Sequence, residues 1–126
     1  MNLHAKEWDT LLYALVDGPI EVSKTISLLK GVMDQARKKG VTKVLIDGRM
    51  VTGNMIKADR IRAAHVVAEH AEMLRTKVWI AFVGGFPTFN GLGVRRARVL
   101  GFKIDLFSDV TEALRWLNTN RSASES

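Results

Sequence analysis

Short apolar runs alternate along this chain with longer segments whose apolar residues recur at helical spacing. KVLIDGRMV, which begins at Lys43, and KVWIAFVGG, from Lys77 to Gly85, are the clearest runs. The segments from Ile20 to Lys39 and from Asn54 to about Leu74 show the helical spacing. Strands that alternate with helices are joined by right-handed crossovers. The pattern therefore predicts a mostly parallel sheet between layers of helices.

The remaining segments complete an α/β fold. TLLYALVD, ending at Asp17, is typical of a strand followed by a turn, and the preceding NLHAKEWD can form a short edge strand that folds back on it. A glycine-weakened helix is expected from Thr88 to Leu100, then the strand KIDLF and a helix that begins at Asp109. We expect a single-domain, mixed but mainly parallel sheet of four or five strands with four helices, spanning residues 1–118, and a disordered polar tail over 119–126.

Composition narrows the classes of protein to which the chain can belong. It has 126 residues, 47% of them hydrophobic, which suits one core. No apolar run is long enough to span a bilayer and no secretory signal is visible, so a cytoplasmic protein is expected. The absence of cysteine excludes disulfides and thiolate metal sites, and His65 and His70 are not at the spacing that metal binding on one helix face requires. No metal or cofactor is predicted.

The net charge of +6 does not by itself indicate nucleic-acid binding. Most of the basic residues stand at or just beyond predicted helix ends, where they offset the helix dipole. Aromatic residues are not interleaved with them, as a nucleic-acid surface would require. Nucleic acid is therefore an unlikely partner. The basic helix-end residues are Arg37, Lys38, Lys39, Lys43, Arg75, Lys77 and Lys103.

Loops that follow the predicted strands should meet at one edge of the sheet, here called the strand-end rim. Open α/β sheets place their ligands there, and helix starts favour anions. We expect Asp17, Asp47, Gly85 and Asp109 to lie along this rim. Because Asp47 ends a predicted buried strand, its carboxylate needs Arg49 or backbone donors as partners. The candidate rim residues are Asp17, Asp47, Arg49, Thr52, Asn54, Phe86, Thr88, Asn90 and Asp109.

Two interpretations of the rim remain open. It can receive a partner protein or a small anionic ligand, or its Asp, Asn and Thr residues can simply be helix caps and turn formers. Asn54 is expected to cap the second long helix. No arrangement of nucleophile, base and acid is recognisable, so an enzyme is not predicted. A small enzyme would need a buried pocket that holds Asp47 and Arg49.

The chain resembles the STAS domain family, in particular its SpoIIAA-like (STAS/SEC14-like) branch, over about residues 10–118. The resemblance rests on TKVLIDGRMVTG, KVWIAFVGG and the ending IDLFSDVTEALRWL. It implies a mixed sheet and a role in protein–protein regulation, sometimes with small-ligand or lipid binding. In the sigma-factor-regulating members an Asp-Ser-Ser-Gly motif in this loop carries a phosphorylatable serine. The matching place here is Val51-Thr52-Gly53, which makes Thr52 a candidate phosphoacceptor, although the Asp-Ser pair is absent.

The sequence thus predicts a non-enzymatic regulatory module that binds a protein partner through the strand-end rim. The alternative is a carrier domain for a small anionic ligand, a nucleotide or a lipid. The sequence does not decide whether the chain forms a homodimer.

Overall fold

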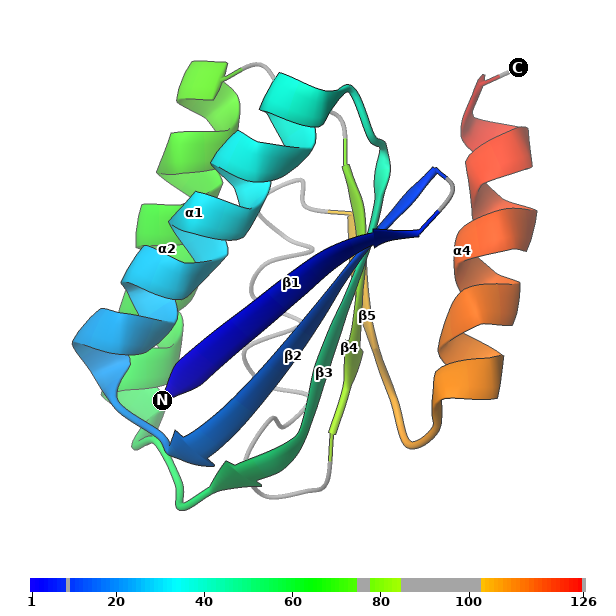
Figure 1. Cartoon of the computed structure of the whole chain (residues 1–126). Coiled ribbons are helices and arrows are strands. Elements are labelled where there is room, and N and C mark those ends of the chain that lie inside the picture. The colour runs from blue at the N-terminus through cyan, green and yellow to red at the C-terminus, as the bar shows by residue number, and fades with distance from the viewer. Residues whose placement is uncertain (9, 75–77, 85–102, 126) are drawn as a thin grey trace.

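A five-stranded sheet separates two helices on one face from a third helix on the other (Figure 1). The structure is a computed structural model that describes residues 1–8, 10–74, 78–84 and 103–125. The predicted helix from 88 to 100 lies outside these residues. The strands are β1 (Asn2–Trp8), β2 (Leu11–Pro19), β3 (Lys43–Thr52), β4 (Trp79–Val83) and β5 (Lys103–Phe107). The helices are α1 (Val22–Lys39), α2 (Lys57–Leu74) and α4 (Val110–Glu125).

The strands follow one another across the sheet in chain order, β1-β2-β3-β4-β5. β1 pairs antiparallel with β2, whereas β2, β3, β4 and β5 pair in parallel. The mixed, mainly parallel sheet and the edge strand that folds back on β2 are therefore confirmed. None of the helices in the described ranges is long and apolar enough to cross a membrane.

The two faces of the sheet carry separate parts of the core because side chains alternate along each strand. On the α1/α2 face, Val44 and Ile46 of β3 pack with Val32 of α1. On the α4 face, Leu45 of β3 packs with Leu117 of α4. This central strand is covered on both sides, as its continuous apolar run predicted.

β3 continues through the segment that the sequence predicts to be a loop. Leu15 of β2 pairs with Asp47, but Asp17 pairs with Met50, so β3 carries one extra residue there, a β-bulge. The strand then runs on to Thr52, which pairs with Pro19. The predicted strand end at Asp47 is wrong, because pairing with the extended β2 overrides the turn preference of Asp-Gly.

The helix ends show both agreement and correction. Gly40 ends α1 in the left-handed conformation (φ 72°), and the Asp109 carboxylate accepts the backbone N–H of Glu112 at the start of α4, both as predicted. α2, however, begins at Lys57, so Asn54 lies outside the helix and does not cap it.

α4 continues to Glu125, where the sequence predicts a disordered tail from residue 119. The expectation of a disordered tail is corrected accordingly. No Gly or Pro occurs between Val110 and Glu125 to end the helix.

Candidate functional site

The Asp47 carboxylate is buried in the middle of β3. Its side chain exposes 1% of its surface. It lies on the α4 face, since it is two residues from Leu45 along the strand. It also pairs with Val83, the last residue of β4, so β3 extends beyond β4 from this point, paired with β2. Asp47 therefore lies level with the end of β4 while five further residues of its own strand project past it.

Four hydrogen bonds are donated to this carboxylate by the residues that the structure describes. The Tyr13 hydroxyl donates to Oδ2 at 2.5 Å, and the backbone N–H of Arg49 donates to Oδ1 at 3.2 Å. The Arg49 guanidinium donates twice, from Nε to Oδ1 at 2.9 Å and from Nη2 to Oδ2 at 2.7 Å. The partners expected for Asp47, Arg49 and a backbone donor, are confirmed, and both carboxylate oxygens are satisfied.

These contacts set the protonation of the three groups. Burial alone would raise the pKa of Asp47, but the hydrogen bonds from Arg49 and Tyr13 outweigh it and hold the pKa below its ordinary value. Burial and the hydrogen bond to Asp47 raise the pKa of Tyr13. The hydrogen bonds to Asp47, and its charge, raise the pKa of Arg49. At neutral pH the site is an ionised pair with a neutral phenol.

The ionised Asp47 carboxylate is better suited to holding the Arg49 side chain in place than to transferring a proton. An ionised Asp47 has no proton to give, and its low pKa makes it a weak base. No group of three or more His, Cys, Asp or Glu that could hold a metal occurs in the described part of the chain. The Arg49 side chain, in contrast, is 52% exposed, so the pair has a buried acidic half and an accessible basic half.

Three other candidate rim residues lie on β2, on β3 or in the loop after β3. Asp17 accepts a hydrogen bond from the Asn2 amide at 3.0 Å and lies 3.7 Å from Nε2 of His4. Thr52 is exposed at the end of β3, where its carbonyl accepts the backbone N–H of Ile20 at 2.8 Å. Asn54 is exposed in the loop after β3.

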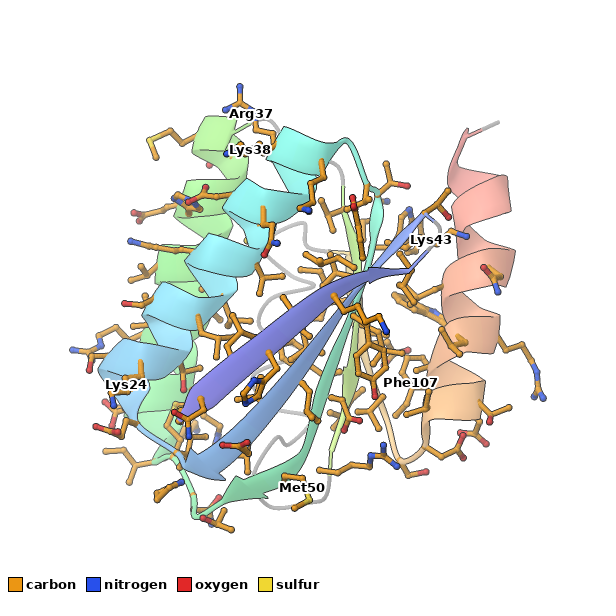
Figure 2. All side chains as sticks on the ribbon, viewed as in Figure 1. Lys24, Arg37, Lys38, Lys43, Met50 and Phe107 are labelled. Atoms are coloured by element: carbon orange, nitrogen blue, oxygen red, sulfur yellow. The ribbon has the colours of Figure 1, made fainter. Side chains whose placement is uncertain are left out.

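Asp109 stands at the start of α4, two residues after Phe107, which pairs with Val83 at the same end of the sheet. Figure 2 shows Phe107 between the sheet and α4. The predicted rim residues Phe86, Thr88 and Asn90, and Gly85 beside them, lie outside the described residues.

Sequence reasoning missed three contributors to the rim. Tyr13 pairs with Leu45, so its hydroxyl reaches Asp47 only because of the register between β2 and β3. Met50 of β3 and Ile56, just before α2, are large apolar residues that are 63% and 68% exposed. Apolar residues beside a strand are normally read as core, so nothing in the sequence alone marked them as accessible.

The basic helix-end residues Arg37, Lys38 and Lys43 lie at the other end of the molecule (Figure 2). Figure 2 shows Arg37, Lys38 and Lys43 far from Met50, which is at the tip of β3. Nζ of Lys43 donates to the Asn118 side chain at 2.8 Å. The rim and the basic end are therefore separate surfaces.

Comparison with known proteins identifies the fold. No protein-family model matches the chain, and no curated protein matches it by sequence. An anti-sigma factor antagonist from Mycobacterium paratuberculosis has a similar structure, with a TM-score of 0.60, 16% identity and 93% of each chain covered. An uncharacterised protein with a SpoIIAA-like fold from Shewanella loihica matches with a TM-score of 0.47, 17% identity and 92% of each chain covered. The first similarity shows that this chain shares the fold of an anti-sigma factor antagonist, as the resemblance to STAS domains predicted.

Proposed function

We propose that this protein is a non-enzymatic regulatory module that binds a protein partner through the strand-end rim. The observation that carries the proposal is a pair of exposed apolar side chains, Met50 near the end of β3 and Ile56 just before α2. The residues between them include the exposed, polar Thr52 and Asn54. Apolar side chains rimmed by polar ones are a common feature of protein contact surfaces.

The fold supports the regulatory part of this proposal. The Mycobacterium paratuberculosis protein that shares it is an anti-sigma factor antagonist, a name that describes action on another protein. Function does not follow from fold alone, and the exposed apolar residues of the rim are the feature that points to a partner. The Asp47–Arg49 pair supports a module without catalysis, since the carboxylate is ionised and fully hydrogen-bonded.

Site-specific photo-crosslinking tests the proposal with a matched control. A photoreactive amino acid replaces Ile56 in one variant and Met73 in another, in cells that express the full chain. Met73 is 73% exposed and lies near the other end of α2, so the two probes differ in place and hardly in accessibility. We expect a defined protein, identified by mass spectrometry, to be captured from position 56 and not from position 73. Capture from position 73 alone, or from neither, would contradict the proposal, and a co-purifying anionic ligand or lipid would then favour the carrier function.

We further propose that Thr52 is the phosphoacceptor of this module. Its side chain is exposed between Met50 and Ile56, where a phosphate would add a charge of about −1.5 to −2 to the contact surface. Because α2 begins only at Lys57, the phosphate would act on the partner and not on the helix dipole, whose effect is confined to the first turn.

A pair of variants and one analytical measurement test the role of Thr52. Thr52→Glu should reduce crosslinking from position 56, whereas Thr52→Gln, of similar size and uncharged, should not. Mass spectrometry of the protein from its native cells should find phosphate on the peptide that contains Thr52. Equal crosslinking by the two variants, or phosphate only on other residues, would refute this role.

A further inference from the structure

Arg49 bonds to the Asp47 carboxylate through one edge of its guanidinium group. Within the described part of the chain, Nε–H and one N–H of Nη2 point to Asp47. A guanidinium carries five N–H donors in one plane. The second N–H of Nη2 and both of Nη1 are not used by Asp47. The Tyr13 hydroxyl also interacts with the guanidinium group, and the rest of this outer edge can receive a further acceptor. With 52% of the side chain exposed, this edge is accessible.

The outer edge is held in a fixed pose. Asp47 is itself 1% exposed and is also held by the Tyr13 hydroxyl, which donates to Oδ2 at 2.5 Å. The bidentate contact with Asp47 leaves the guanidinium group little rotational freedom. A ligand that uses the outer edge would thus lose less side-chain entropy than with a free arginine, which is the advantage of a preorganised donor.

The surroundings of Arg49 indicate what kind of acceptor fits. Leu15 pairs with Asp47 and Asp17 pairs with Met50. Since Leu15 and Asp17 are two residues apart on one strand, Asp47 and Met50 project from the same face of the sheet. The neighbouring β1 adds His4 and Lys6 to this face, because they pair with Leu15 and Tyr13. The surface therefore combines an arginine edge with an exposed methionine.

We infer that Arg49 receives a carboxylate from an acidic segment of the partner protein, while an apolar residue beside that carboxylate covers Met50. This inference rests on the proposed function. The planar arginine edge matches a carboxylate with two parallel hydrogen bonds. Asp17, which lies on the same face, repels a dianionic phosphate more strongly than a monoanionic carboxylate. The net charge of +6 favours encounter with an acidic partner.

Nuclear magnetic resonance titration of the full chain tests the inference without the natural partner. The probe is the peptide acetyl-Glu-Leu-Glu-amide, the matched control is acetyl-Gln-Leu-Gln-amide, and inorganic phosphate at equal ionic strength forms a third arm. The Glu peptide should shift the Arg49 Nε–H signal and the Met50 methyl signal. It should bind roughly tenfold more tightly than the Gln peptide, because it forms charge-assisted hydrogen bonds.

Variants of Arg49 and Met50 distinguish the contribution of the planar guanidinium edge from that of its positive charge. Arg49→Lys keeps the positive charge and loses the planar edge, so the Glu peptide should bind it roughly tenfold more weakly. If Arg49→Lys does not fold, Met50→Gln serves as the second variant. Because Met50 is exposed, this substitution should weaken the binding of the Glu peptide without unfolding the protein. Equal binding of the two peptides to wild type, or shifts produced by phosphate and not by the Glu peptide, would overturn the inference. A partner crosslinked from position 56 together with such a result would leave the proposed function intact and refute only the role of Arg49.

Discussion

The Asp47 carboxylate is buried inside the sheet and yet stays ionised. An unpaired charge in that position would be strongly destabilising, so the structure depends on the donors supplied by Arg49 and Tyr13. Arg49 could be predicted because it lies two residues away in the sequence. Tyr13 could not, since 34 residues separate it from Asp47 and only the strand register brings them together.

The depressed pKa of Asp47 makes a prediction for acid stability. A carboxyl whose pKa is lower in the folded state contributes stability that is fully present well above the ordinary value of 3.8 and is lost as the pH falls through the folded value. Tyr13→Phe removes one donor, so it should lower the free energy of unfolding at pH 7 by about 1 kcal/mol. It should also reduce the further loss of stability between pH 7 and pH 3. Urea unfolding monitored by tryptophan fluorescence measures both quantities.

The comparison with wild type isolates the contribution of this one carboxyl, because the other acidic residues are common to both proteins. If Tyr13 instead competed with Arg49 for Asp47, Tyr13→Phe would raise the free energy of unfolding at pH 7. An unchanged pH dependence in Tyr13→Phe, or a gain in stability at pH 7, would show that the hydroxyl does not stabilise the ionised carboxylate.

At the scale of elements, the largest error of sequence-based prediction concerns β3. Asp47-Gly48 followed by Thr52-Gly53 has the composition of a turn, but β2 runs on through Gly18 and Pro19 and pairs with it. Such pairing is long-range information that local composition does not contain. The helix ends at Gly40 and Asp109 were predictable because caps depend on neighbouring residues alone.

Substitution by alanine should change the stability of the protein in opposite directions at two glycines, one within α1 and one at its end. Gly31 lies within α1, where an added Cβ would meet no atom within 4 Å, so Gly31→Ala should stabilise the protein by about 0.5–1 kcal/mol. Gly40 has a φ of 72°, a conformation that alanine adopts at a cost of about 1 kcal/mol or more, so Gly40→Ala should destabilise it. Thermal unfolding of the two variants measures the difference. Stabilisation by both would show that α1 does not end in a left-handed residue at Gly40.

At the scale of the whole molecule, the sheet separates two surfaces of different character. The strand-end rim carries Arg49, Met50 and Ile56, whereas the basic residues Arg37, Lys38 and Lys43 lie at the other end (Figure 2). The alternation of strands and helices was enough to predict this division, because parallel strands all point the same way. Exposure was not predictable, since it depends on which apolar residues the rest of the fold leaves uncovered.

The central claim is that a partner contacts the strand-end rim, and amide hydrogen exchange of the full chain tests it most directly. Exchange is measured for the chain alone and in complex with the protein that is crosslinked from position 56. We predict slower exchange in peptides that cover residues 48–56, with little change over residues 37–43 at the basic end. Protection confined to residues 37–43, with residues 48–56 exchanging as in the free chain, would contradict the account.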